Sequence, residues 1–242
     1  MGTSSRTYQR FSHKGANFRI GCDWLEVVTA EIVKQRHVLE DYIRLQPEFQ
    51  VTLRPIELLP HAPEVACRMA AAAARVGVGP MAAVAGAMAQ LAAEAALRAG
   101  ADEAIVENGG DIYLVARKPV VIGLVAGSAQ LSDRLAFRVE PGETPVSICS
   151  SSGRMGRSMS LGACDLATVV ADDAALADAA ATLAGNLVKT AQDIDPALKR
   201  MMAIDGIRGV LLAKDDRVGL MGRLPKLIRG GVTAELVTGL DA

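Results

Sequence analysis

Residues 107–114 read Glu107-Asn108-Gly109-Gly110-Asp111-Ile112-Tyr113-Leu114, with apolar runs on both sides. Glycine has no Cβ, so a Gly-Gly pair can take positive φ angles, and this pair predicts a tight turn between two strands. Asn108 and Asp111 place an amide and a carboxylate at the two ends of that turn. A plain hairpin turn is enough to explain the pattern by itself. A binding role therefore depends on what the rest of the chain contains.

The chain downstream of Ala104 changes to short apolar runs that are bounded by Gly, Pro, Asp or Lys. Such runs are typical of strands. They are Ile105-Val106, Ile112–Val115, Val120–Val125, Leu135–Val139, Val146–Cys149, Leu166–Val170, Val210–Ala213 and Val218–Met221, and residues 17–30 and Phe49–Leu53 read as further strands.

Helices are predicted mainly from small, strong helix formers and from their end signals. Asp172 or Asp173 is a predicted N-cap, and Gly100 is a predicted C-terminal cap. The expected helices are Glu31–Leu45, Pro63–Val76, Met81–Arg98, Ala174–Val188 and Pro196–Met202. Helices grouped beside a meandering sheet favour an α+β fold with a mostly antiparallel sheet and packed Ala-rich helices. We expect one domain over residues 1–242, in which residues 1–60 could form a subsidiary layer.

Composition narrows the class of partner. The 242 residues include only 3% aromatics, and the formal net charge is −1, so no basic field exists for sequence-independent nucleic-acid binding. We therefore expect no nucleic-acid partner. Ala/Gly-rich helices are compatible with a homo-oligomer. The four cysteines, Cys22, Cys67, Cys149 and Cys164, show no zinc-type spacing and are expected to be reduced thiols.

The chain is also expected to be cytoplasmic, with no membrane partner. Residues 1–11 contain Arg6 and Arg10 but no apolar segment typical of a signal peptide. The longest weakly charged stretch, Val76–Ala89, is too short to cross a bilayer.

A second group of polar residues lies in the Ala174–Val188 helix. Asp178 and Thr182 are four residues apart, so their side chains project from one face of the helix. A carboxylate and a hydroxyl at that spacing are hard oxygen ligands that could share a Mg²⁺ ion, leaving positions for water and phosphate oxygens. By spacing alone, a solvated helix face is the more economical interpretation.

A third group is the run Ile148–Gly153, where a strand passes into a hydroxyl-rich turn. Ser152 and Gly153 could donate hydrogen bonds to an anion, although an ordinary polar loop explains the run equally well. The histidines, His13, His37 and His61, all lie in the first quarter of the chain and are expected at the surface.

The order of these elements resembles the ApbE family, the FAD:protein FMN transferases, over residues 78–185. The resemblance rests on Ala85-Gly86 in an Ala-rich helix, Asn108-Gly109-Gly110-Asp111, Ser152-Gly153, and Ala177-Asp178 with Thr182. The sequence around Val78-Gly79-Pro80-Met81-Ala82 resembles more closely still a poorly characterised cytoplasmic ApbE-like branch.

The resemblance implies a T-fold type of architecture that binds FAD with Mg²⁺ on its pyrophosphate. The implied metal ligands are Asp178, Thr182 and a main-chain carbonyl around Ala82 to Val84. The implied nucleotide-binding residues are Asn108, Gly109, Gly110, Asp111, Ser152 and Gly153. The implied reaction is attack by a hydroxyl of a target protein on the FMN phosphorus, with AMP leaving.

The chain departs from the family pattern at three places. Ala85 stands where the family has a lysine, and Gln90 stands where it has an acidic residue. Residues 157–167 contain no counterpart of the family's His-x-x-Asp-Pro-x-Thr-Gly segment. These departures leave three hypotheses open: FMN transfer or FAD pyrophosphate cleavage, a non-catalytic ligand-binding or accessory protein on the same fold, and a role in anaerobic sulfide assimilation.

Overall fold

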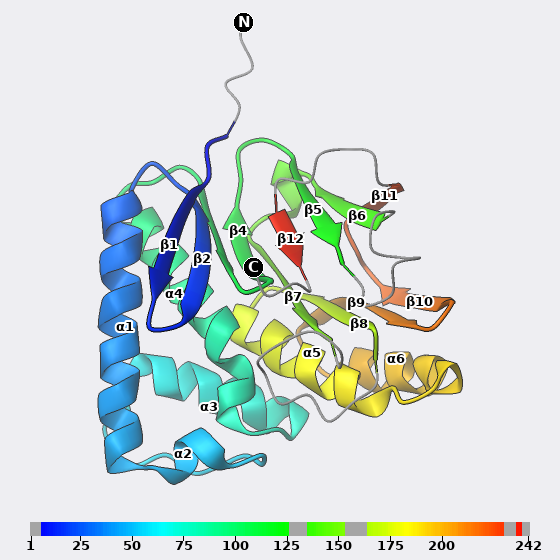
Figure 1. Cartoon of the computed structure of the whole chain (residues 1–242), viewed down its shortest axis with the longest axis horizontal. Helices are drawn as coiled ribbons and strands as arrows, with labels where there is room; N and C mark the ends of the chain where they lie inside the picture. Colours follow the sequence, from blue (N-terminus) through cyan, green and yellow to red (C-terminus); the bar gives the residue numbers. More distant parts are fainter. Residues whose placement is uncertain (1–5, 126–134, 153–163, 230–235, 239–242) are drawn as a thin grey trace, which may run out of the picture.

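Two sheets and one layer of helices make up the described part of the chain (Figure 1). The computed structural model describes residues 6–125, 135–152, 164–229 and 236–238. Among these, the larger sheet has the order β1-β2-β3-β4-β7-β8-β9-β10, and its neighbours pair antiparallel. Its strands are β1 (Gln9–His13), β2 (Ala16–Gly21), β3 (Ala104–Asn108), β4 (Asp111–Val115), β7 (Val146–Ser151), β8 (Leu166–Ala171), β9 (Ile207–Lys214) and β10 (Arg217–Gly222).

The smaller sheet has the order β11-β6-β5-β12 within the described ranges. Its strands are β5 (Val120–Leu124), β6 (Leu135–Val139), β11 (Lys226–Arg229) and β12 (Leu236–Thr238). Strand β12 runs parallel to β5, and the other pairs are antiparallel. The expected α+β fold with a mostly antiparallel sheet is confirmed.

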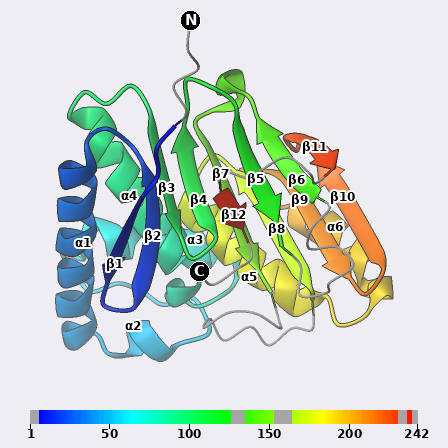
Figure 2. The same cartoon turned by 45° about the horizontal axis from the view of Figure 1, so that its top comes forward.

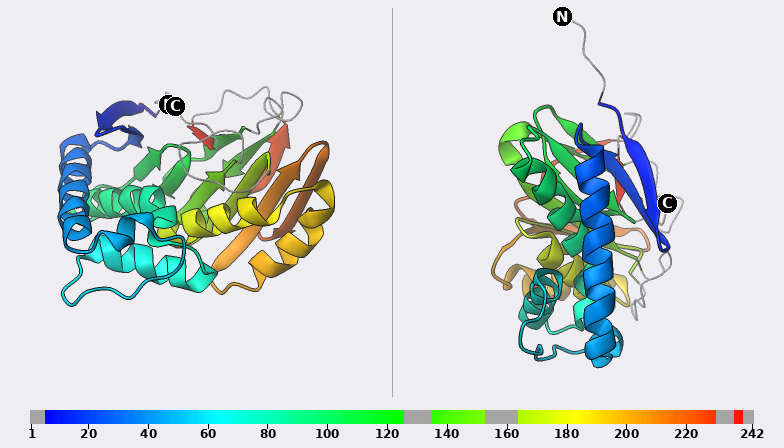
Figure 3. Two further views of the ribbon diagram at one scale, coloured as in Figure 1. Left: turned by 60° about the horizontal axis from the view of Figure 1, so that its bottom comes forward. Right: turned by 90° about the vertical axis from the view of Figure 1, so that its left-hand side faces the viewer.

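The helices cover one face of the larger sheet, and the smaller sheet covers part of the other face (Figure 3). Helices α4 and α5 pack against each other and on the central strands β3, β4, β7 and β8. The helices are α1 (Leu25–Leu45), α2 (Glu48–Val51), α3 (Glu64–Val76), α4 (Val84–Arg98), α5 (Ala174–Leu187) and α6 (Ile194–Met202), with 3-10 turns at Pro80–Ala83, Pro141–Glu143 and Ala191–Asp193.

Alternation along the strands divides the apolar residues between two cores. On β3, Ala104 and Val106 face the helices, whereas Ile105 faces the smaller sheet. All three are fully buried. The same alternation continues to the end of the strand, so Asn108 lies on the helix side and Glu107 on the opposite side.

Three helix ends form where the sequence predicts them: the start of α5 and the ends of α3 and α4. The Asp173 carboxylate accepts a hydrogen bond of 2.7 Å from the Leu176 N–H and caps α5. Gly77 takes φ +80° after α3, and Gly100 takes φ +104° after α4. A left-handed glycine just past a helix satisfies its last carbonyl groups without a Cβ penalty.

Two segments differ from the expected structure. Phe49–Leu53 is not a strand, because residues 48–51 form α2, in which Phe49 is fully buried and packs edge-on against Tyr42. Residues 25–30, expected as a strand, form the first turns of α1. Val28, Ile32 and Leu39 are buried on one face of that helix, so packing outweighs the local preference of adjacent valines for a strand.

One helical segment, Pro80–Arg98, is long and apolar enough to span a membrane within the described residues. About two thirds of it is buried inside the fold, as expected of a core helix. Length and composition alone therefore do not make it a membrane segment.

Candidate functional site

The N-terminus of α4 is capped by a carboxylate from another helix. Asp178 on α5 accepts a hydrogen bond of 2.9 Å from the Gly86 N–H, and it also interacts with the Ala85 N–H. These N–H groups lie in the first turn of α4, where they have no intrahelical acceptor. Asp178 therefore satisfies orphan donors and places negative charge at the positive end of the helix dipole.

The contact between α4 and α5 depends on Gly86. A Cβ built on Gly86 would overlap the carbonyl oxygen of Ala174. The two helices also exchange caps, because the Ala174 N–H donates to Oε1 of Gln90 on α4 at 2.7 Å. Each helix thus supplies a side chain to the start of the other.

The Gly109-Gly110 turn lies beside this helix junction. Gly109 and Gly110 take φ angles of +60° and +94°, as a two-glycine hairpin requires. Asn108 pairs with Asp111 across the turn, and both residues are buried. The Asn108 Nδ2 group donates to the Ala85 carbonyl oxygen at 3.2 Å. Figure 2 shows β3 and β4 side by side in the larger sheet, and α4 and α5 lie behind them.

Asp111 is held in a buried, polar corner. Its Oδ1 accepts a hydrogen bond of 3.3 Å from the Ser150 N–H, and the Cys149 thiol also interacts with it. Burial raises the pKa of Asp111 well above its usual range, and the nearby charge of Asp178 raises it further. Burial also raises the pKa of Asp178, while its two backbone N–H partners oppose this shift. The two carboxyl groups therefore repel each other when both are ionised, and a proton or a cation would relieve that repulsion.

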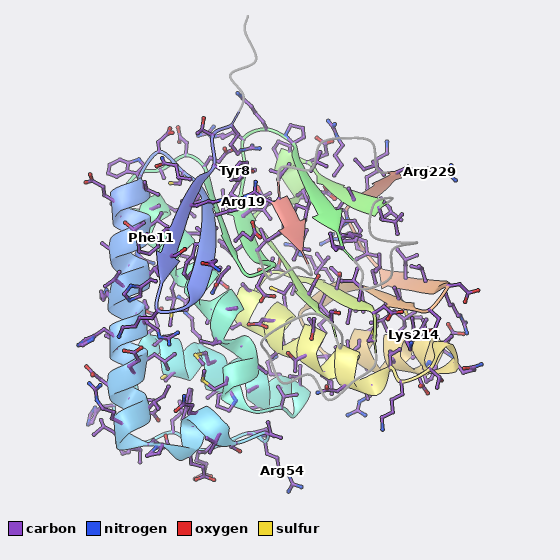
Figure 4. The ribbon with its side chains drawn as sticks, in the orientation of Figure 1. Tyr8, Phe11, Arg19, Arg54, Lys214 and Arg229 are labelled. Atoms are coloured by element: carbon purple, nitrogen blue, oxygen red, sulfur yellow. The ribbon has the colours of Figure 1, made fainter. Side chains whose placement is uncertain are left out.

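Glu107 occupies the opposite face of β3. Its side chain is only 4% exposed, and within the described residues Oε2 has no hydrogen-bond partner. The Arg19 Nε atom is 4.0 Å away, which is an ion-pair distance but too long for a hydrogen bond. Figure 4 shows Arg19 close to Tyr8, and its guanidinium lies 5.8 Å from the centre of that ring. Burial raises the pKa of Glu107 to about 7, and the charges of Arg19 and Arg10 oppose the rise.

The sequence-predicted site residues are only partly gathered at this junction. Asn108, Gly109, Gly110 and Asp111 lie at the turn, and Asp178 meets them through Ala85 and Gly86. Thr182 lies one turn further along α5 and is half-buried. Ser152 is buried just after β7. Gly153 lies outside the described residues.

Two roles were missed by sequence reasoning. Asp178 caps α4 although the bonded residues are 92 positions apart in the chain, and local patterns give no signal for such a contact. Glu107 was quoted without a role, although a carboxylate between apolar β residues on the buried face of a strand is itself a signal. Of the histidines expected at the surface, His37 and His61 are exposed and His13 is partly exposed.

The oxygen donors at the junction are suited to a hard cation. Asp111 and Asp178 offer carboxylates, and Thr182 carries a hydroxyl one turn further along α5. Within the described residues, no group of three or more His, Cys, Asp or Glu side chains could hold a metal ion. A cation here would need most of its ligands from water or from a bound molecule, which is the usual arrangement for Mg²⁺.

The cysteines do not form a thiol site. All four are free; Cys149 and Cys164 are buried, whereas Cys67 is exposed. Burial raises the pKa of Cys149 well above its usual range, and the charges of Asp111 and Asp178 add to this. Cys149 is therefore a protonated thiol in the core, not a reactive thiolate.

Sequence comparison finds a family and close relatives. A family model described as "AbpE bacteria" matches residues 4–209. A UPF0280 protein of Methanosarcina acetivorans is 41% identical over 215 residues, which cover 88% of this chain and 85% of the relative. A UPF0280 protein of Methanocella arvoryzae is 40% identical over 240 residues, covering 96% of this chain and 98% of the relative.

Structure comparison finds the same fold in solved proteins. The apo flavinyl transferase ApbE of Pseudomonas stutzeri has a TM-score of 0.57 at 12% identity, with 91% of this chain and 96% of that chain covered. The ApbE protein of Thermotoga maritima has a TM-score of 0.55 at 14% identity, with coverages of 94% and 97%. At these identities the likeness is one of architecture.

Proposed function

Because the chain belongs to the ApbE-like family, we propose that it binds a flavin nucleotide or a related phosphorylated ligand with Mg²⁺. The proposed reaction is FMN transfer from FAD to a target protein, or cleavage of the FAD pyrophosphate. The site is the junction of the Gly109-Gly110 turn with α4 and α5. One observation supports this place above others: two carboxyl groups with raised pKa, Asp111 and Asp178, meet there beside a glycine turn and a helix N-terminus.

Carboxylate and hydroxyl oxygens are the kind of hard ligand that suits Mg²⁺. Asp178 and Thr182 would hold the ion, and the carboxylate of Asp111 lies near enough to Asp178 to interact with its charge. When bound, Mg²⁺ would neutralise negative charge on a pyrophosphate as its P–O bond breaks. Carboxyl groups with strongly shifted pKa values that share one site are typical of functional sites, although structural ion-pair networks also shift pKa values.

The chain's own residues would bind and orient the ligand. Gly109 and Gly110 allow a phosphate group to approach the main chain without a Cβ in the way. Asn108 is held by its bond to the Ala85 carbonyl, so its amide has a fixed direction. Ser152, buried just after β7, follows the strand that supplies the Ser150 N–H to Asp111.

A second candidate is a ligand-binding protein without catalysis. It is favoured by the structural role of Asp178, which caps α4 and would stabilise the fold even if no metal were bound. Ala85 and Gln90, which stand where the family has a lysine and an acidic residue, also favour this candidate. The Gln90 side-chain oxygen caps α5. The buried, protonated Cys149 gives no support to a thiol-based role in sulfide assimilation.

The experiment incubates the purified protein with FAD and MgCl2 and follows AMP and FMN by chromatography. Thr182→Val is the informative variant, because it removes an oxygen ligand and leaves the Asp178 cap in place. We expect Mg²⁺-dependent turnover in the wild type and at least a ~10-fold loss in the variant, with little change in melting temperature. Binding of FAD without any turnover would favour the second candidate. No binding of FAD, FMN or ADP would reject both.

Three further expectations remain proposals. The chain would form one ApbE-like domain over residues 1–242, act in the cytoplasm, and self-associate through its Ala/Gly-rich helices. Gel filtration with light scattering tests the last of these.

A further inference from the structure

A cavity of about 540 Å³ lies at the end of β2 and β3 that is remote from the Gly109-Gly110 turn. Its walls come from four chain segments, residues 6–9, 21–24, 100–103 and 117–118. Strand β3 has 5 residues, so the cavity is separated from the turn by about 14 Å along the strand. Its volume lies in the roughly 300–1,000 Å³ range of small-molecule sites. The cavity is therefore a candidate site apart from the one proposed for the phosphates.

One wall of the cavity is built around Arg6, whose side chain is only 9% exposed. Its guanidinium donates to the Glu103 carboxylate at 2.6 and 2.9 Å and to the Lys118 carbonyl oxygen at 3.1 Å. The same Glu103 carboxylate accepts a hydrogen bond of 2.8 Å from the Arg117 N–H. These bonds join the N-terminal segment to the start of β3 and to the loop after β4, so the wall forms without a ligand.

The lining carries both signs of charge in equal number. The cations are Arg6, Arg117 and Lys118, and the carboxylates are Asp23, Asp102 and Glu103. Arg117 and Asp102 form an ion pair of 2.6 Å in which the side chains are 67% and 80% exposed. Such an exposed pair contributes little to stability, so a ligand carboxylate can replace Asp102 as the partner of Arg117. A lining with both signs matches a molecule that itself carries both charges.

Trp24 gives the cavity an aromatic surface. It is the one tryptophan of the chain, it is 42% exposed, and it follows the exposed Asp23. Its ring lies over Gly100, where an added Cβ would be 3.8 Å from the ring. An ammonium group beside an indole ring and a carboxylate gains both a cation–π and a Coulomb attraction. The Asp23-Trp24 pair is thus suited to the positive end of a ligand.

From these walls we infer that the cavity binds a free α-amino acid in its zwitterionic form. The ammonium group lies at Trp24 and Asp23, and the carboxylate pairs with Arg117. The ligand is bound without any covalent change. The inference goes beyond the proposed function and does not depend on it, because the cavity shares no residue with the glycine turn or the α4–α5 junction.

The test uses Trp24 as a reporter, because fluorescence of the single tryptophan arises at this cavity. The full-length protein is titrated with each common L-amino acid at pH 7, with calorimetry for tryptophan and tyrosine, which fluoresce themselves. Acetate and methylammonium, which each carry one of the two charges, are titrated in parallel. We expect saturable binding of at least one amino acid with a dissociation constant of about 1 mM or below. Neither single-charge compound should bind comparably.

Two variants assign the binding to the cavity. Asp23→Asn and Arg117→Gln should each weaken the amino acid by at least ~10-fold. Their matched controls, Glu26→Gln and Arg44→Gln, change exposed charges on α1 outside the lining and should bind like the wild type. All four replaced side chains are exposed, so we expect folded proteins, which circular dichroism checks.

The thiol of Cys22 supplies a second readout, because it lines the same cavity and is partly exposed. A bound amino acid should slow alkylation of Cys22, measured by peptide mass spectrometry, and leave the exposed Cys67 unaffected. No saturable binding of any amino acid would overturn the inference. Equal binding of acetate or methylammonium would overturn it in favour of a simple ion site. Amino-acid binding that both Asp23→Asn and Arg117→Gln leave unchanged would place the ligand elsewhere and overturn it too.

Discussion

Glu107 is a buried carboxyl group whose Oε2 has no hydrogen-bond partner among the described residues. A carboxylate removed from water without a hydrogen bond is unfavourable unless it is protonated or paired with a close cation. Arg19 at 4.0 Å provides only part of that compensation. The free energy of unfolding should therefore depend on the protonation of this group.

The expected sign follows from the direction of the pKa shift. Burial raises the pKa of Glu107 from 4.5 to about 7 in the folded protein. Its contribution to stability is then fully present below about pH 4.5 and is lost as the pH rises through 7. Glu107→Gln should raise the free energy of unfolding at pH 8 by up to about 3 kcal/mol, and by almost nothing at pH 4.

Urea denaturation of both proteins at pH 4, 6 and 8 measures this difference. Asp102→Asn, which changes an exposed carboxylate in the loop before β3, is the control and should show no comparable pH dependence. A Glu107→Gln protein with the same pH slope as the wild type would contradict a raised pKa at Glu107 in the folded protein.

Gly86 allows the helices α4 and α5 to pack closely against each other. Helices α4 and α5 approach closely at this position and exchange caps through Asp178 and Gln90. The donors at both helix starts are satisfied only while this crossing is maintained. The crossing is thus a single unit of structure, built from two helices that are far apart in the sequence.

Gly86→Ala should destabilise the protein, although alanine favours helices. The new Cβ would overlap the Ala174 carbonyl, so the helices must separate. Overpacking of this kind costs about 1–3 kcal/mol, which exceeds the gain of roughly 1 kcal/mol expected for Gly to Ala inside a helix. Thermal or chemical denaturation measures the loss.

Gly142→Ala is a matched control for that substitution. A Cβ at Gly142 would meet no atom within 4 Å, and the residue lies in a short 3-10 turn. We expect it to leave stability nearly unchanged. A stabilised Gly86→Ala protein would show that the two helices are not held together at this distance.

At the scale of the whole molecule, stability should respond to Mg²⁺ in a pH-dependent way. The raised pKa values of Asp111 and Asp178 mean that protons compete with a cation for the same carboxyl groups. The rise in melting temperature caused by Mg²⁺ with ADP should therefore be larger at pH 8 than at pH 6. Thermal denaturation with ADP, in the presence and absence of MgCl2 at each pH, measures it.

Asp111→Asn separates metal binding from general salt effects. It preserves the acceptor for the Ser150 N–H while removing one charge. We expect the variant to lose most of the pH dependence of the Mg²⁺ effect. Equal shifts at both pH values in the wild type would contradict the shared carboxylate site.

The fold was predictable where local signals and packing agree. The Gly109-Gly110 hairpin, the Asp173 cap and the strands after Ala104 follow from turn chemistry, capping and alternation. The strand predicted for Phe49–Leu53 was wrong. The segment is too short to show a hydrophobic period, and the burial of Phe49 against Tyr42 favours a helical turn there. Strands β1, β11 and β12 had no clear pattern, because they are short strands at or near sheet edges.

The candidate site was predictable as a set of residues but not as a geometry. Asp178 and the glycine turn could be named from spacing and from family resemblance. Their connection through Ala85 and Gly86 could not, because it requires the crossing of α4 and α5. The division of Asn108 and Glu107 between opposite faces of β3 follows from strand alternation once the strand is known.

The shared role of Asp178 limits what evolution can reveal about this protein. A descendant that had abandoned chemistry would remain under selection to keep that acid, since losing it would expose the start of a central helix. Retention of Asp178 in a relative would thus be uninformative about activity, whereas replacement of Thr182, the other proposed metal ligand, would be informative.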